Sequence, residues 1–380
     1  MKQLLVDVSE LIRHDIRTGI QRVTRSVLFY LCKNPPPGYT VLPVYASLDS
    51  NGYFYADFAC RTDGTVLHIP DHACPIRFAD HDVFLGLDLQ PYIVTAQEEF
   101  LQAMHLEGVI IYFVVYDLLP VRFPWHFPER TVKAHRKWLD VICRFSGILC
   151  DSRSAAMDFQ LWLKENNKKV ADEFDIQWFH CGGDFENSLP TSGLPRQTDR
   201  IQEKIRNSIT FLMVGTLEAR KAHKQVLDAF EILWKQGKDV VLIIVGKEGW
   251  NMSQLVDRIN EHDELGKRLF WLNRVSDEYL DKIYTVSTVL LHASEGEGFG
   301  LPVLESVKYE KPLILRDIPV FREIAGESAF YFSGLSPEEM ADKIAEWLVL
   351  FEKGVAPSSE GIKFLTWEQS TKMLLNKLPV

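Results

Sequence analysis

Apolar residues along the chain form short continuous runs and helically spaced sets, and these two patterns alternate. The first run, QLLVDV (3–8), has the length of a strand. A helical pattern follows over 20–31, in which Ile20, Val23 and Val27 share one face. The chain therefore opens with a predicted strand and helix.

Further strand-length runs follow in the first half: YTVLPVYA, DVFLGLD, GVIIYFVVYD and GILCDS. The third is apolar from 109 to 116, which is typical of a parallel strand covered on both faces. A helix is predicted at 131–143, and Ser152 is placed to cap the helix that follows the fourth run.

The second half repeats strand–helix pairs more regularly. The strand-length runs are SITFLMVGT, DVVLIIVG, LFWLN, STVLLHAS and PLILRD, each followed by a helical pattern. The last helix, from SPEEMADK, has a serine cap and a proline in its first turn. Strands that alternate with helices at this spacing predict a parallel, doubly wound sheet.

The chain is too long for one hydrophobic core. At 380 residues, two domains are expected. Residues 187–200, rich in Pro, Ser, Gly and Thr, are predicted to link them. The expected fold class is α/β, with Rossmann-like domains at 1–190 and 200–364 that face each other across a ligand-binding cleft.

Composition argues against several classes of protein. The formal net charge of −10 argues against general binding to nucleic acid, and the six cysteines form no CxxC pair that would indicate a zinc knuckle. No apolar run approaches the length of a membrane span, and the N-terminus turns acidic at once, so we expect a cytoplasmic protein. The basic stretches RHDIRTGIQR and ERTVKAHRK suggest peripheral contact with the inner face of the membrane, although solvated helix faces explain them equally well.

The stretch EGEGFGLPVLES carries the chemistry. It lies between a predicted strand and a helix that should start near Pro302. Backbone N–H groups of Gly298 to Leu301, together with the helix N-terminus, make an anion site suited to phosphate. Glu297 and Glu305, the latter expected in the first helical turn, can accept hydrogen bonds from sugar hydroxyls. A nucleotide sugar carries all of these parts.

Two other interpretations compete for this stretch. Glutamates near helix N-termini are common for reasons of the helix dipole alone. A dinucleotide-binding loop is excluded by spacing, because Gly296 and Gly298 are followed by Leu301 instead of glycine, and no GxGxxG follows the first strand.

The string EGEGFGLPVLES resembles the Glu-x7-Glu signature of retaining glycosyltransferases of family 4, also called glycosyltransferase group 1, which have the GT-B fold. FLMVGTLEARKAHKQVLDAF resembles the segment that opens that family's donor domain, and DIPVFREIAGESAFYF the segment after the signature. TGIQRVTRSVL and YDLLPVRFP resemble bacterial enzymes that build mannose- or rhamnose-containing O-antigen and capsule chains. The last residues, 365–380, resemble the closing helix that returns to the first domain.

The resemblance assigns roles to the signature residues. Glu297 would contact the transferred sugar and Glu305 the ribose, while Lys221 would neutralise the leaving diphosphate with help from Arg220. Main-chain contacts to the diphosphate and sugar would come from Gly298, Phe299, Gly300 and Leu301. No metal and no cofactor other than the nucleotide-sugar donor are expected.

The resemblance also concerns three further positions of the second half. Many relatives have an arginine where this chain has Thr216, so charge neutralisation rests more on Lys221 and Arg220. Arg274 and Val275 align with the loop that meets the base, and uracil, guanine and thymine all stay open.

In the first half, Gly19 matches a loop that approaches the donor phosphates, although a turn glycine explains it equally well. Asp117, at a strand end, would meet the sugar or the acceptor hydroxyl, and a cap or turn aspartate is the alternative. Relatives often have histidine where this chain has Tyr116.

The implied reaction is transfer of a hexose with retention of configuration, above all mannose from GDP-mannose, to a growing O-antigen, capsule or lipid-linked glycan. Rhamnose from dTDP-rhamnose is the nearest alternative. A sugar-nucleotide epimerase of the same fold and a non-catalytic partner in polysaccharide assembly are further alternatives.

Overall fold

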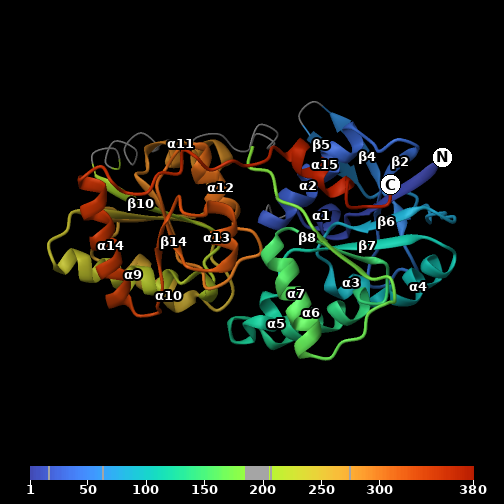
Figure 1. Ribbon diagram of the computed structural model, residues 1–380, viewed down its shortest axis with the longest axis horizontal. Helices are drawn as coiled ribbons and strands as arrows, with labels where there is room; N and C mark the ends of the chain where they lie inside the picture. The colour runs from blue at the N-terminus through green and yellow to red at the C-terminus, as the bar shows by residue number, and fades with distance from the viewer. Residues whose placement is uncertain (16–17, 62–63, 185–204, 206–207, 274) are drawn as a thin grey trace. The chain divides into compact units, whose positions relative to one another are not determined.

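The computed structural model describes the chain except for residues 16–17, 62–63, 185–204, 206–207 and 274. The chain forms two compact units (Figure 1). Unit 1 comprises Met1–Ser188 and Leu365–Val380, and unit 2 comprises Leu189–Phe364. Each unit is described by itself.

Unit 1 is built on a seven-stranded sheet in the order β3-β2-β1-β6-β7-β8-β9, parallel except for β3. The strand order reverses between β1 and β6. The strands of this sheet are β1 (Lys2–Asp7), β2 (Tyr39–Tyr45), β3 (Phe54–Tyr55), β6 (Val83–Gly86), β7 (Ile110–Val115), β8 (Gly147–Cys150) and β9 (Asp175–Trp178). A separate antiparallel pair is formed by β4 (Asp57–Arg61) and β5 (Gly64–His68).

Helices cover this sheet. The main apolar cluster of unit 1 joins β6, β7 and β8 to α3 (Pro91–Ala96), α4 (Glu98–Leu106), α6 (Glu129–Ile142) and α7 (Arg153–Glu165). The C-terminal α15 (Trp367–Leu375) packs against α2 (Gly19–Lys33), although the two lie at opposite ends of the sequence (Figure 1). Two short helices, α1 (Ser9–Arg13) and α5 (Leu119–Arg122), follow β1 and β7, and a 3-10 turn, η1 (Pro124–His126), follows α5.

Unit 2 has a fully parallel six-stranded sheet in the order β12-β11-β10-β13-β14-β15. This is the Rossmann order, in which the direction of the strand sequence reverses between β10 and β13. The strands are β10 (Ile209–Val214), β11 (Val240–Val245), β12 (Leu269–Leu272), β13 (Val289–His292), β14 (Leu313–Arg316) and β15 (Phe330–Phe332).

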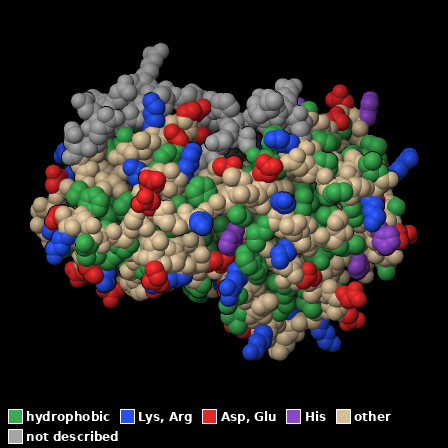
Figure 2. All heavy atoms as spheres, turned by 45° about the horizontal axis from the view of Figure 1, so that its top comes forward, with side chains coloured by type: hydrophobic (Ala, Val, Ile, Leu, Met, Phe, Trp, Pro, Cys, Tyr) green, Lys and Arg blue, Asp and Glu red, His purple; other side chains and the backbone are tan. Residues whose placement is uncertain are grey.

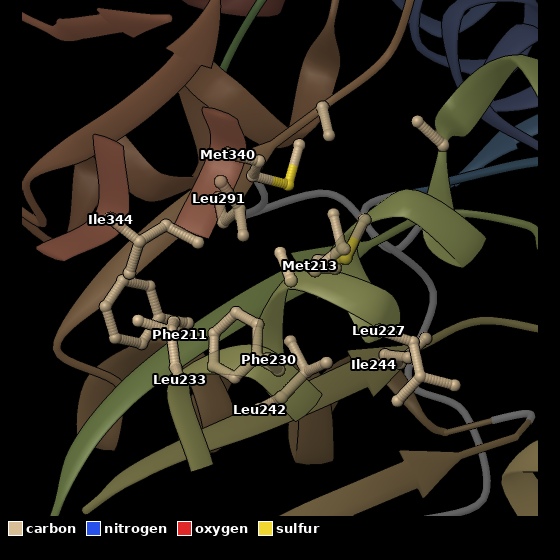
Figure 3. Close-up of a cluster of buried hydrophobic side chains, with 14 of the residues drawn as sticks. Phe211, Met213, Leu227, Phe230, Leu233, Leu242, Ile244, Leu291, Met340 and Ile344 are labelled. Carbon is tan, nitrogen blue, oxygen red and sulfur yellow. The ribbon is translucent and has the colours of Figure 1, made fainter. Parts of the chain in front are cut away.

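Two apolar clusters fill the two faces of the unit 2 sheet. One joins the sheet to α9 (His223–Lys235), α10 (Ser253–Asn260) and α14 (Pro337–Glu352), and Phe211, Phe230 and Met340 meet within it (Figure 3). The other joins the sheet to α11 (Asp277–Val286), α12 (Leu301–Lys308) and α13 (Pro319–Ala325). Because both faces are covered, the strands are mainly apolar, as their sequences indicate, with the polar His292 and Arg316 at the ends of β13 and β14.

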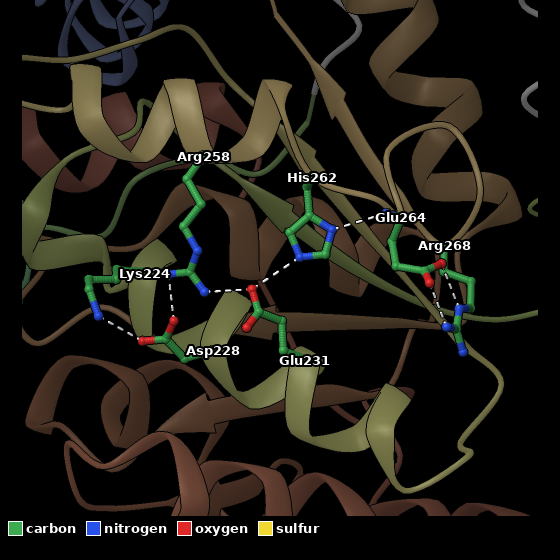
Figure 4. A network of polar contacts seen from close by, with 7 residues as sticks. All are labelled: Lys224, Asp228, Glu231, Arg258, His262, Glu264 and Arg268. Atoms are coloured by element: carbon green, nitrogen blue, oxygen red, sulfur yellow. Dashed lines mark hydrogen bonds and ion pairs between the residues drawn. The ribbon is translucent and has the colours of Figure 1, made fainter.

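A network of ion pairs ties α9 to α10 (Figure 4). Arg258 on α10 lies 2.6 Å from both Asp228 and Glu231 on α9, and Lys224 bonds Asp228 at 2.8 Å. These residues belong to the half-exposed side of the two helices, so the network supports the helix pair and does not include the loops after β10 and β13.

The strong sequence patterns are confirmed as elements. The predicted first strand and helix are β1 and α2, and the predicted caps Ser152 and Ser336 accept hydrogen bonds from Ala155 N and Glu339 N. The short helices α1, α3, α4, α5 and α13 and the strands β3, β4, β5, β9 and β15 were not predicted. The predicted linker 187–200 lies outside the described residues.

Candidate active site

Two loops of unit 2 meet where the strand order reverses. One follows β10 and the other follows β13, and these strands are neighbours in the sheet. Arg220 NH1 donates to the Gly296 carbonyl at 3.0 Å, and Glu295 N donates to the Arg220 carbonyl at 2.8 Å. This edge of a doubly wound sheet is where such folds bind ligands.

Glu297 is the centre of the junction. Its Oε1 lies 2.8 Å from Lys221 Nζ and accepts a hydrogen bond from the Ser294 hydroxyl at 2.6 Å. Its Oε2 lies 3.2 Å from Arg220 NH1. A buried carboxylate needs such partners, because leaving it unpaired costs several kcal/mol. Glu297 is therefore held in one orientation from three sides.

The charge state of Glu297 follows from these partners. Burial alone would raise the pKa of this carboxyl, but the Lys221 and Arg220 cations outweigh burial and hold the pKa well below its usual range. Burial lowers the pKa of His292 to about 3, against a smaller opposing effect of Glu297. His292, with Nε2 at 3.7 Å from Glu297 Oε1, is thus neutral at pH 7 and contributes no ion pair.

Glycine and a second carboxylate position the two cations. Gly215 has φ +141°, and a Cβ on it would stand 3.1 Å from Lys221 Nζ, so the lysine side chain lies back over this glycine. Arg220 NH2 lies 2.9 Å from Glu218 Oε2. Lys221 and Arg220 form the 3-10 turn η2 (Ala219–Lys221) just before α9. Cations there oppose the helix dipole, and pairing with two glutamates compensates for this.

The glycine loop enters α12 through a left-handed residue. Gly300, the N-cap, has φ +95°, and a Cβ on it would lie 2.9 Å from the Phe321 ring. Phe299 is buried, and α12 begins at Leu301 with Pro302 in its first turn. Only glycine meets both the φ and the space requirement at position 300.

The structure corrects the placement of Glu305. This residue lies in the second turn of α12, and no acidic residue lies in the first turn. Its closeness to the loop therefore does not come from the helix start. Glu305 is buried, and its Oε2 accepts a hydrogen bond from Tyr284 of α11 at 2.6 Å.

Three of the remaining predicted donor-site residues lie in the segments that follow β10, β12 and β13. Thr216 follows β10 and is half-buried beside Gly249, on which a Cβ would stand 3.1 Å from Thr216 Cγ2. Gly298 lies within the loop next to Glu297. Val275, after β12, packs against the apolar cluster on the α11–α12 face. Arg274 lies outside the described residues.

The two predicted residues in unit 1 have local structural roles. Gly19 is not a loop residue, as expected from sequence, but the first residue of α2, behind a capping box formed by Thr18 and Gln21. Asp117 Oδ1 accepts a hydrogen bond from Leu119 N at 3.0 Å, at the start of α5. This bond to the residue two positions on is the turn role that was an alternative for Asp117, and a role toward substrate stays a prediction.

Four further residues support the site and were not predicted. Ser294 and His292 precede Glu297 closely in sequence, and their alternation at the end of a buried strand was the one available signal. Glu218 lies in the loop of the cations it pairs with. Tyr284 lies 21 residues before Glu305, and no spacing pattern links the two.

Within the described residues, no cluster of three or more His, Cys, Asp or Glu side chains could hold a metal ion. In the same part of the chain, no helix combines the length and the apolar character needed to cross a membrane.

The sequence of unit 2 matches a known domain family. Residues 195–361 match the family model described as Glycosyl transferases group 1. For this segment, the match confirms the resemblance drawn from the Glu297–Glu305 signature.

Individual proteins that are similar to the chain include bacterial mannosyltransferases. The chain is 40% identical, over its whole length, to the serotype-specific mannosyltransferase WbdA of Escherichia coli. It covers 45% of that protein and so spans about half the length of this relative. The O-antigen chain mannosyltransferase RfbU of Salmonella typhimurium is 31% identical over 36% of this chain and 37% of its own.

Solved structures confirm the fold class. Sucrose-phosphate synthase from Thermosynechococcus elongatus aligns over 99% of this chain and 98% of its own, with a TM-score of 0.69 and 12% identity. Anabaena HepE in complex with UDP-glucose aligns over 100% of both chains, with a TM-score of 0.65 and 16% identity. The chain therefore has the GT-B fold that was predicted from its sequence.

Proposed function

We propose that this chain is a retaining glycosyltransferase that transfers mannose from GDP-mannose to a growing O-antigen, capsule or lipid-linked glycan. The observation that carries the proposal is the buried cluster of Glu297, Lys221 and Arg220 where the strand order of unit 2 reverses. The group 1 domain and the similarity to WbdA support the reaction class and the sugar.

The chemistry asked of these residues is positioning and charge stabilisation. Lys221 and Arg220 would neutralise the diphosphate as its bond to the sugar breaks, without a metal ion. Their present partner, Glu297, stays ionised and would accept a hydrogen bond from a hydroxyl of the transferred sugar. Ser294 keeps the Glu297 carboxylate oriented while Lys221 turns toward the phosphates.

In this proposal the two units would bind different substrates. Unit 2 carries the residues proposed for the donor, and unit 1 with α15 would bind the acceptor. Asp117 and Gly19 are then acceptor-side or phosphate-side candidates. Glu305 would hold the ribose, and the main chain of Gly298 to Leu301 the diphosphate.

Thermal-shift measurements with a panel of nucleotide sugars test the donor. GDP-mannose and GDP should raise the melting temperature, and at a hundred times Kd a ligand adds about 2.7 kcal/mol of stability. UDP-glucose, ADP-glucose and dTDP-rhamnose should give smaller shifts. A larger shift with dTDP-rhamnose would instead favour the rhamnosyltransferase. No shift with any diphosphate would favour a non-catalytic assembly partner, and isomerisation of UDP-GlcNAc without acceptor would favour an epimerase.

Peripheral binding to the inner face of the cell membrane is part of the proposal. Trp125, in the turn η1 between α5 and α6, is 71% exposed, and Met157 and Leu161 on α7 are 57% and 43% exposed. Arg122 on α5 pairs with Asp158 and Glu165, which ties α5 to α7. The exposed basic residues of α6 are Arg130, Lys133, Arg136 and Lys137. Basic and apolar side chains lie side by side over the lower part of this unit (Figure 2).

A basic face with exposed apolar side chains, on a chain of net charge −10, suits an anionic lipid surface. Co-sedimentation with vesicles should show binding that requires phosphatidylglycerol and weakens in Trp125→Ser and in Arg136→Glu/Lys137→Glu. Trp250→Ser in unit 2, where Trp250 is 38% exposed, is the matched control. Equal binding to neutral vesicles, or no effect of the unit 1 substitutions, would remove this part of the proposal.

A further inference from the structure

The carboxylate of Glu305 is held by a residue from another helix. Tyr284, on α11, places its hydroxyl 2.6 Å from Glu305 Oε2 and 3.5 Å from the Pro302 carbonyl. A hydroxyl has one proton to donate, and the shorter contact to a carboxylate is the stronger of the two. Both side chains are buried, so water does not replace this bond easily.

The Tyr284 ring is itself fixed. It stacks on the ring of Tyr309, at the end of α12, with centroids 5.4 Å apart and planes 6° apart. The Tyr309 hydroxyl bonds Asp281, one turn before Tyr284 on α11. Lys308 of α12 lies 4.0 Å from the same Asp281 carboxylate. These contacts join α11 to α12 beside the Tyr284–Glu305 hydrogen bond.

These contacts explain how Glu305, although it lies in the second turn of α12, can serve the site at the loop between β13 and α12. Glu305 gets no placement from the helix start, and the hydrogen bond from Tyr284 restricts rotation of its carboxylate about the terminal bond of the side chain. With Tyr284 on Oε2, the plane of the carboxylate is set. Each carboxylate oxygen accepts more than one hydrogen bond, so both remain able to receive the vicinal hydroxyls of a ribose.

We infer that Tyr284 is a positioning residue that orients Glu305 toward the ribose and makes the site select ribonucleotide donors over 2′-deoxyribonucleotide donors. The inference rests on the proposed function, in which Glu305 meets the ribose. It also favours GDP-mannose over dTDP-rhamnose, because a thymidine donor lacks the 2′-hydroxyl. A site built to hydrogen-bond a substrate hydroxyl rejects the analogue that lacks this hydroxyl, because the analogue cannot form the bond that the site offers.

The test compares affinities for GDP and 2′-deoxy-GDP by calorimetry in three proteins. The wild type should prefer GDP by roughly tenfold or more, and Tyr284→Phe should reduce that ratio toward one, chiefly through weaker GDP binding. Tyr309→Phe keeps the stack and the Tyr284 hydroxyl, so it should keep the ratio. With GDP-mannose and acceptor, Tyr284→Phe should raise KM more than it lowers kcat.

The outcomes separate the inference from the proposed function. If the wild type binds neither diphosphate, the proposed function fails. If it binds both equally, or if Tyr284→Phe retains the wild-type ratio, the donor site stands and the role of Tyr284 is overturned. The wild-type ratio decides the ribose selection even if the Phe variant does not fold.

Discussion

At the scale of single residues, the site depends on a compact set of buried charges. Glu297 is shared between Lys221 and Arg220, and Arg220 is shared between Glu297 and Glu218. The neutral His292 lies beside them without adding charge. A diphosphate would add negative charge where two cations already balance two carboxylates, so the donor competes with Glu297 for Lys221.

Lys221→Met should remove both a stabilising pair and a diphosphate ligand. We expect a loss of about 2–3 kcal/mol in the free energy of unfolding, because Glu297 keeps only Arg220 as a cation. Affinity for GDP should fall at least about tenfold. Denaturant unfolding and calorimetry with GDP measure the two effects.

Lys224→Met is the matched control. Lys224 lies on α9 close to Lys221 in sequence, but its side chain is 73% exposed and pairs with Asp228 within the helix. Its loss should cost less than about 1 kcal/mol and leave GDP binding unchanged. Wild-type GDP affinity in Lys221→Met would contradict the assigned role.

At the scale of elements, the loop from β13 into α12 depends on Gly300. Gly300→Ala should cost about 2–3 kcal/mol, because the left-handed conformation is strained for alanine and the new methyl group would press on Phe321. The displaced loop should also weaken GDP binding. Thermal unfolding and calorimetry measure both effects.

Gly237→Ala separates strain from steric contact. Gly237, after α9, has φ +78°, and nothing lies within 4 Å of an added Cβ. It should lose only about 1 kcal/mol and bind GDP normally. If the two alanine variants were equally stable and bound GDP equally well, the close packing of Gly300 against Phe321 would not be needed for stability or for GDP binding.

The elements also show what sequence can and cannot predict. The buried parallel strands were predictable because both faces demand apolar residues, and the Gly-Pro helix start was predictable from backbone restrictions. The short helices α1 and α5 were missed because one or two turns show no clear period. Gly19 was misplaced because the sequence does not show that α1 intervenes before α2.

The residues of the candidate site also differ in whether the sequence alone could predict them. Glu297 and Lys221 could be predicted because each lies in a characteristic local string. Tyr284 could not, because its partner Glu305 is set by packing between α11 and α12. Likewise, Glu305 was assigned to the wrong turn because the helix starts at Leu301, before the start near Pro302 that the sequence predicted.

At the scale of the whole molecule, buried histidines make the stability of unit 2 depend on pH. The pKa of His223 and of His292 is lowered to about 3, chiefly by burial and in addition by the nearby Lys221 and Arg220 cations. The unfolded chain takes up these protons near its ordinary pKa of 6.5. Stability is therefore fully present above that value and is lost as pH falls from there toward 3.

At pH 5 the loss should be about 2 kcal/mol for each histidine. Unit 1 also has a buried histidine, His135, whose pKa burial lowers to about 4. Burial raises the pKa of Asp7 to about 6 and of Asp88 to about 7, so protonation of these two carboxyls favours the folded state of unit 1 and offsets the effect of His135. Hydrogen exchange by segment at pH 7.5 and pH 5 should show protection lost mainly in unit 2. Equal loss in both units would contradict this assignment.

The two units together define the proposed reaction, and its central claim is transfer of mannose with retention at the site built around Glu297. The most direct measurement is NMR of the product formed from GDP-mannose and a mannose-terminated acceptor, with wild type and Glu297→Ala compared. We predict release of GDP and an α-linked mannose from the wild type, and no transfer from a folded Glu297→Ala. A β-linked product, or transfer at the wild-type rate by Glu297→Ala, would contradict the account.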